Sequence, residues 1–143
     1  MIAIGDWGAR CVGLERPRPL RNSVTRIPEP AAPPVVDVDA FLARVQGDTG
    51  LASGMAALFL LECPQQLADV RAAVTARDRG AIERSAHRLK GSVANFSAAA
   101  ATAAAAHVEL LGRTGDLAPS DEALRTLEVE IERIIPALRE FIA

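Results

Sequence analysis

A histidine, a lysine and a glycine follow one another closely in the middle of this 143-residue chain. Residues 86–92 read Ala-His-Arg-Leu-Lys-Gly-Ser. On a helix, the spacing puts Lys90 and Gly91 one turn after His87. A neutral imidazole is a nucleophile near neutral pH, and a nearby ammonium stabilises negative charge on a group that the imidazole accepts. A glycine inside a helix costs about 1 kcal/mol relative to alanine. Gly91 therefore indicates that something must approach the backbone beside His87.

The apolar residues around this motif predict which side of the helix the histidine occupies. At about 100° per residue, one stripe collects Ile82, Ala86, Leu89, Val93 and Phe96. His87 lies roughly 140° from Ile82 on the same wheel and about 60° from Lys90. We therefore expect the stripe to be buried and His87 to face solvent, with small residues at Gly91 and Ala94 leaving room for a partner.

Basic residues surround the predicted site. Arg84 and Arg88 flank His87 on a chain whose net charge is −2, so this surface favours an acidic partner. We predict that Arg84, Arg88 and Ala94 bind that partner. A lone surface histidine beside basic residues is more often only a solvated side chain. His107, which no Lys-Gly follows, is interpreted in that way, as structural or merely exposed.

The elements that must position the motif are all helical in pattern. Apolar residues recur at helical spacing after residue 36, and alanine, the best helix former, is abundant. We predict helices over about 37–47, 51–77, 78–95, 97–115 and 119–142. Asp78 is the expected N-cap of the third helix, and Pro64 and Pro136 are expected to bend theirs. Short connections favour antiparallel neighbours. The sequence thus predicts an all-α fold, an antiparallel four-helix bundle with a short additional N-terminal helix.

Two of these helices carry explicit predictions about their buried faces. The inner face of the second helix is predicted to hold Leu51, Met55, Leu58, Phe59, Leu67, Val70 and Val74. The amphipathic stripe of the last helix is predicted to hold Leu124, Leu127, Ile131, Ile134, Leu138 and Phe141.

Residues 1–36 differ from the rest because they contain six of the nine prolines together with several arginines. Such a density of proline blocks both helix and central strand. We interpret residues 1–36 as a linker or disordered tail and residues 37–143 as the helical bundle.

The composition excludes several function classes. A pI of about 5.7 without a long basic run argues against nucleic-acid binding. No apolar stretch reaches the roughly 18 residues that a membrane span needs, and no signal peptide is recognisable. We expect a cytoplasmic protein in which Cys11 and Cys63 are reduced thiols. The scattered cysteines and histidines predict neither a metal site nor a cofactor site.

Residues 86–92, followed by Ala94-Asn95-Phe96, resemble the signature of histidine-containing phosphotransfer (HPt) domains. The resemblance extends over about residues 37–142 and includes Phe59, Asp78, Val108-Glu109 and residues 112–117. Ser97 departs from the family, which often has glycine there.

The resemblance implies a monomeric phosphoryl carrier without its own ATP site or cofactor. His87 would accept a phosphoryl group from the aspartate of a receiver domain and pass it to another receiver. Lys90 would assist and Gly91 would keep the approach open. The implied partners are response-regulator receivers, which would carry Mg²⁺, and a hybrid histidine kinase that residues 1–36 could join to this domain.

Other functions fit the residues less well, but one remains open. A sensor-kinase dimerisation domain would place an acidic residue and a proline where Arg88 and Ser92 stand. No nucleotide-binding motif or Arg-His-Gly phosphatase signature occurs in the sequence. The open alternative is a helical adaptor that binds a receiver without transferring a phosphoryl group.

Overall fold

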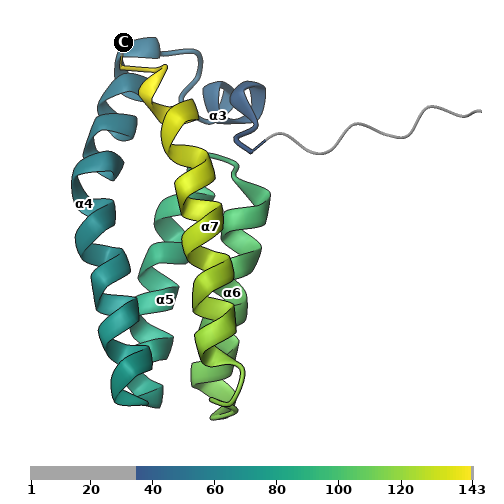
Figure 1. Cartoon of the computed structure of the whole chain (residues 1–143). Coiled ribbons are helices and arrows are strands. Elements are labelled where there is room, and N and C mark those ends of the chain that lie inside the picture. Colours follow the sequence, from purple (N-terminus) through teal and green to yellow (C-terminus); the bar gives the residue numbers. More distant parts are fainter. Residues whose placement is uncertain (1–34, 143) are drawn as a thin grey trace, which may run out of the picture. The chain divides into compact units, whose positions relative to one another are not determined.

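The structure, a computed structural model, describes residues 35–142. This range contains five helices and no strand (Figure 1), which confirms the predicted all-α fold. The helices are α3 (Val38–Arg44), α4 (Thr49–Ala76), α5 (Arg79–Ala94), α6 (Ala99–Thr114) and α7 (Ser120–Arg139). None of these helices combines the length and the apolar character that a membrane crossing requires.

The four long helices form the predicted bundle, and α3 is the predicted short additional helix. Helix α5 packs against α4 on one side and α6 on the other, and α7 packs against α6 and α4. Figure 1 shows the four helices running alongside one another, with α3 at the end of the bundle where α4 begins. Short connections between long helices produce this antiparallel arrangement.

The buried stripe of α5 agrees with its prediction. All five of its predicted core residues, from Ile82 to Phe96, are at most 2% exposed. The stripe of α7 is confirmed at Leu127, Ile131, Ile134 and Leu138, while Leu124 and Phe141 are partly buried. A strict helical period with large aliphatic residues on one side leaves each of these helices a single face to bury.

The inner face of α4 differs from the predicted one. Leu51 and Leu58 were expected inside but are about half exposed, at 50% and 54%. Ala52 and Ala56 occupy the inner positions instead and are fully buried. Apolar residues occur on both sides of α4, so the spacing of its apolar residues did not show which side is buried. The small alanine side chains allow the neighbouring helices to approach closely there.

The aromatic side chains gather at the α3 end of the bundle. The ring centroids of Phe41 and Phe96 are 4.9 Å apart, and those of Phe41 and Phe141 are 5.2 Å apart. Phe59 contacts Phe96 edge-on at 5.2 Å. This cluster attaches α3 to α4 and to the segments that follow α5 and α7, so α3 contributes to the main core.

Three aspartates define the beginnings of α3, α4 and α5. The side chains of Asp37, Asp48 and Asp78 each accept a hydrogen bond from the backbone N–H three residues later. Asp78 is thus the N-cap that the sequence predicts for α5. Helix α4 runs unbroken through Pro64, although proline provides no N–H for the backbone ladder.

The start of α6 was predicted wrongly. The helix expected over about 97–115 begins at Ala99, and Ala98 occupies the N-cap position without a side-chain cap bond. Ser97 instead has a left-handed backbone with φ of 54°. Glycine adopts this conformation at no steric cost, which gives a physical reason for a glycine preference at that position.

The predicted linker falls mostly outside the described residues, as does Cys11. Val35 and Val36 are described, and they pack against the core, with Val36 only 3% exposed. The folded part therefore includes two residues that the sequence analysis assigned to the linker.

Candidate functional site

His87 lies on the exposed face of α5, as predicted. Its side chain is 69% exposed, whereas its neighbours Ala86 and Leu89 are fully buried. Asp78 fixes the start of the helix, and the buried stripe fixes its rotation about its own axis. Together they determine the direction in which the imidazole projects.

Helix α6 comes very close to α5 beside this histidine. A Cβ atom added at Gly112 would lie 2.7 Å from the backbone nitrogen of Glu83 and 2.9 Å from the carbonyl oxygen of Arg79. Such distances leave no room for any side chain larger than hydrogen. Gly112 therefore permits the backbones to meet, and the residues one turn before it on α6 come within hydrogen-bonding range of α5.

Glu109 occupies that position and holds His87 and Lys90 together. Its Oε1 lies 2.9 Å from Nδ1 of His87, and its Oε2 lies 2.6 Å from Nζ of Lys90. Nη2 of Arg113 is 2.8 Å from the same Oε1, and Nε of Arg113 is 3.2 Å from Glu83. The Glu109 side chain is only 4% exposed, so α6 contributes a buried carboxylate to the site on α5.

The carboxylate of Glu109 is kept ionised despite its burial. Burial by itself would raise the pKa of the Glu109 carboxyl, but hydrogen bonds from Lys90 and His87, together with their charges, more than compensate and lower that pKa. An ionised carboxylate can only accept hydrogen bonds. His87 therefore donates from Nδ1–H, and in the neutral ring the lone pair belongs to Nε2.

The surroundings of His87 contain open space. A Cβ atom added at Gly91 would have no neighbour within 4 Å. A hollow of about 360 Å³ beside the imidazole is lined by Glu83, Arg84, His87, Glu109 and Arg113. Ala94 instead lines a separate hollow between α3, α5 and α6.

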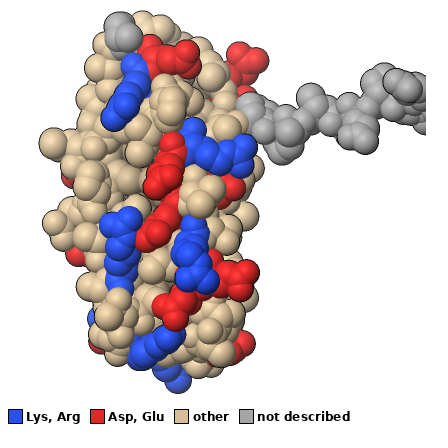
Figure 2. All heavy atoms as spheres, in the orientation of Figure 1, with Lys and Arg blue, Asp and Glu red and all other residues tan. Residues whose placement is uncertain are grey.

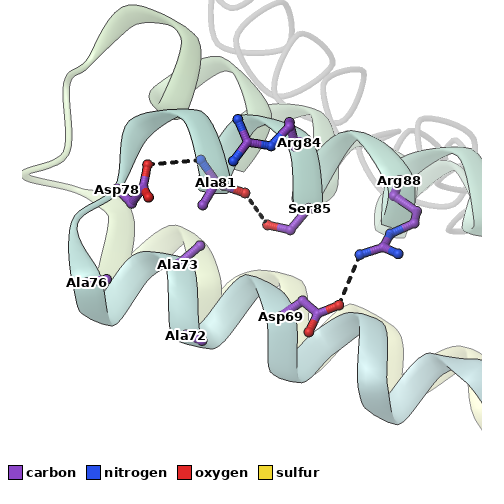
Figure 3. A pocket seen from close by; sticks show the side chains of 9 residues that line it. All are labelled: Asp69, Ala72, Ala73, Ala76, Asp78, Ala81, Arg84, Ser85 and Arg88. Carbon is purple, nitrogen blue, oxygen red and sulfur yellow. Dashed lines mark hydrogen bonds and ion pairs between the residues drawn. The ribbon is translucent and has the colours of Figure 1, made fainter.

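The two predicted partner-binding arginines are in different situations. Nη2 of Arg88 lies 2.9 Å from a carboxylate oxygen of Asp69 on α4, across a hollow of about 560 Å³ (Figure 3). Arg84 also lines this hollow, but in Figure 3 its side chain points away from α4. Acidic and basic side chains alternate over the face of the bundle seen in Figure 2, without a large region of one sign.

The remaining candidates do not join the site. His107 is exposed on α6 and takes part in no hydrogen bond or ion pair within the described residues. Cys63 is a buried free thiol, and burial raises its pKa. No group of three or more histidine, cysteine, aspartate or glutamate residues in the described range is arranged to hold a metal ion.

The sequence analysis named Glu109 and Arg113 only as part of a matching segment and assigned neither a role. One signal for Glu109 is present in the sequence. It stands among buried positions of α6, four residues after Ala105 and three before Gly112. A carboxylate on an otherwise apolar helix face requires charged or hydrogen-bonding partners. Those partners lie on α5 and became visible only in the folded chain.

Comparisons with known proteins agree with this geometry. The family model described as the Hpt domain matches residues 54–140, which is more than half of the chain. The crystal structure of histidine-containing phosphotransfer protein B (HptB) from Pseudomonas aeruginosa PAO1 matches with a TM-score of 0.69 and 24% sequence identity. That match covers 76% of this chain and 95% of the HptB chain. The search among curated proteins gave no significant match. A helical bundle that presents the exposed His87 beside Lys90 and Gly91, together with the match over residues 54–140, shows that this chain belongs to the Hpt-domain family of phosphotransfer proteins in two-component signalling.

Proposed function

We propose that this chain is a phosphorelay intermediate whose phosphoacceptor is Nε2 of His87. It accepts a phosphoryl group from the aspartate of one receiver domain and passes the group to another. The observation that carries the proposal is the hydrogen bond between Nδ1 of the exposed His87 and the buried carboxylate of Glu109. This bond leaves Nε2 as the nitrogen with a free lone pair.

The transfer step follows from this arrangement. The Nε2 lone pair attacks the phosphorus of the receiver's aspartyl phosphate, and the P–N bond forms as the bond from phosphorus to the aspartate oxygen breaks. The aspartate leaves as a carboxylate, so no proton has to move. The imidazole ring becomes positively charged, and the Glu109 carboxylate 2.9 Å from Nδ1 stabilises that charge. Transfer to the next receiver is the reverse reaction.

Lys90 and Gly91 support the same step in different ways. The ammonium of Lys90 is bonded to Glu109, and its side chain is 31% exposed, so it adds positive charge next to the site and helps to keep Glu109 ionised. Gly91 keeps the approach to Nε2 free, because the space beyond it is open. A large side chain at residue 91 would project into the path of a receiver.

The proposed partners follow from the family. They are response-regulator receiver domains, which supply Mg²⁺ in their own acidic sites, and a hybrid histidine kinase. We propose that the bundle acts as a monomer in the cytoplasm. Residues 37–143, together with the packed Val35 and Val36, form the phosphotransfer domain, and the residues before them serve as a linker.

Phosphoryl transfer from a radiolabelled receiver tests the proposal. The wild-type chain and the His107→Gln variant should both become labelled, whereas His87→Gln should remain unlabelled. The His107 variant is a matched control because it removes the other histidine, which is exposed on the neighbouring helix. Binding of the receiver without any transfer would instead identify an adaptor, and labelling of the His87 variant would place the acceptor elsewhere.

A further inference from the structure

The basic residues around His87 differ in how many carboxylates already hold them. Lys90 and Arg113 are both bonded to Glu109, and Arg113 also contacts Glu83. Arg88 is bonded to Asp69 on α4. The side chain of Arg84 makes no hydrogen bond or ion pair with any described residue. Arg84 is therefore the one cation on this surface of the described domain that is not committed to a carboxylate.

Arg84 is also placed where it can reach a group on the imidazole. It precedes His87 by three residues on α5, and residues at this spacing are neighbours on a helix surface, with about 5–6 Å between Cβ atoms. Both residues line the same hollow of about 360 Å³. The two other groups on α5 that line this hollow or adjoin it, Glu83 and Lys90, are paired with α6.

The resting position of Arg84 leaves it free to move. A Cβ atom added at Gly80 would lie 3.0 Å from Nη1 of Arg84, so the guanidinium rests over this glycine, one turn before its own position. There it makes no hydrogen bond or ion pair with a described residue, and Oδ1 of Asp78, which caps α5, lies 3.7 Å from the same added Cβ. Turning the side chain towards His87 therefore breaks no ion pair or hydrogen bond.

The charge balance of the site favours this movement after phosphorylation. The carboxylates of Glu109 and Glu83 compensate the charges of Lys90 and Arg113, and Asp78 caps the start of α5, so Arg84 is the cation beside the hollow that is in no ion pair with a described residue. A protein-bound phosphoryl group brings roughly −1.5 to −2 charges and three acceptor oxygens. The planar guanidinium of arginine can donate two parallel hydrogen bonds to such a group.

We propose that Arg84 binds the phosphoryl oxygens of phosphorylated His87, and that Arg88, committed to Asp69, does not. The proposal rests on the proposed function, since it requires His87 to be the phosphoacceptor. It separates two arginines that look equivalent in the sequence. Arg84 becomes a residue of the phosphorylated site, and Arg88 becomes a structural link between α4 and α5.

The test uses phosphoramidate, a small phosphoryl donor, so that no receiver is needed. Nε2 attacks its phosphorus and ammonia leaves. The phosphohistidine is then titrated by ³¹P nuclear magnetic resonance in the wild-type protein and in Arg84→Gln, Arg84→Lys and Arg88→Gln. A nearby cation favours the more negative form of a phosphoryl group. We expect Arg84→Gln to raise the titration midpoint by about half a pH unit, with Arg84→Lys close to wild type and Arg88→Gln unchanged.

Each outcome of this experiment decides a different point. Superimposable titrations of the wild type and Arg84→Gln, or an equal shift in Arg88→Gln, would overturn the role of Arg84 while leaving His87 as the acceptor. Absence of a phosphohistidine signal in the wild type, or an undiminished signal in a His87→Gln variant, would overturn the proposed function itself. All three arginine variants change exposed residues, so we expect the fold to be retained.

Discussion

The two sides of α5 are built differently, although the same helix contributes to both. On the α6 side, Gly112 lets the backbones approach until a Cβ atom would collide with Glu83. On the α4 side, a hollow of about 560 Å³ remains between the helices, and four of its nine lining residues are alanines. Arg88 and Asp69 bridge this hollow at the surface.

The two sides of α5 therefore have different roles: the α6 side forms the surroundings of His87, and the α4 side holds the helices together. The close side places a buried carboxylate from α6 against the histidine of α5, an arrangement that a wider spacing would not allow. On the open side, polar pairs link α4 and α5, among them Arg88 with Asp69 at the surface and Ser92 with the buried Gln66 at 3.1 Å. We therefore expect the position of the His87 side chain to depend on the packing of α5 with α6 much more than on its packing with α4.

The largest effect is expected from adding a methyl group where α5 and α6 are in close contact. Gly112→Ala should destabilise the fold by about 2 kcal/mol, because the new Cβ meets backbone atoms that cannot move independently. Gly91→Ala is the matched control. It adds the same atom into open space and should stabilise the helix by up to about 1 kcal/mol. Chemical denaturation of both variants measures these changes, and equal destabilisation would contradict our account of the α5–α6 contact.

Removing the charge of Glu109 should affect both stability and phosphorylation. Glu109→Gln should cost about 1–2 kcal/mol near neutral pH, since three charge-assisted contacts weaken. It should also slow phosphorylation about tenfold, as the imidazolium loses its counter-charge.

The loss of stability at acidic pH gives a second test of Glu109. The pKa of Glu109 is below its usual value of 4.5, so its contribution is present above that value and is lost as the pH falls through the folded-state pKa. Denaturation measured from pH 6 downwards should therefore show a smaller loss of stability in Glu109→Gln than in the wild type. Parallel profiles would show that the carboxylate is not held in its charged form.

Lys90→Ala tests the role of one cation in this cluster. We expect a loss of about 1 kcal/mol in unfolding free energy, because Glu109 keeps its contacts with His87 and Arg113. The transfer rate should fall severalfold. Rapid-quench measurement of receiver-to-His87 transfer would show this effect, and an unchanged rate would remove Lys90 from the mechanism.

Substitutions on the α4 side of α5 should change the stability much less. Arg88→Gln removes the ion pair with Asp69. The side chains of Arg88 and Asp69 are 60% and 36% exposed, and exposed pairs of this kind contribute roughly 0–1 kcal/mol to the free energy of unfolding. A double-mutant cycle with Asp69→Asn measures the pair directly. A coupling energy well above 1 kcal/mol would make the two sides of α5 energetically similar.

The smallest effect is expected from a shortened chain that begins at Pro33 and so retains the buried Val36. The shortened chain keeps every residue of the five helices, and we expect the helical signal per molecule in circular dichroism to be unchanged. Phosphorylation of His87 should also be retained. Aggregation or a much lower melting temperature would mean that the removed residues pack on the bundle.

Much of the fold could be predicted because its determinants are local. The stripe of α5 and most of the stripe of α7 repeat with a clear period, so the buried face followed directly. Asp78 predicted the start of α5 because aspartate is a preferred N-cap residue. Prediction was weakest where local contrast is low, as in the apolar stretch of α4, and where the backbone adopts an unusual conformation, as at Ser97.

The sequence by itself determined that His87 faces outward on a helix, with Lys90 and Gly91 one turn away, because helical geometry relates residues along one chain segment. Only the tertiary structure decided what holds that histidine. The buried carboxylate comes from Glu109, twenty-two positions further on, and reaches Nδ1 because Gly112 allows two backbones to touch. It also decided that Arg88 is bound to α4 while Arg84 is not. Contacts between helices also depend on which helices are neighbours and how closely they approach, and no local pattern encodes these.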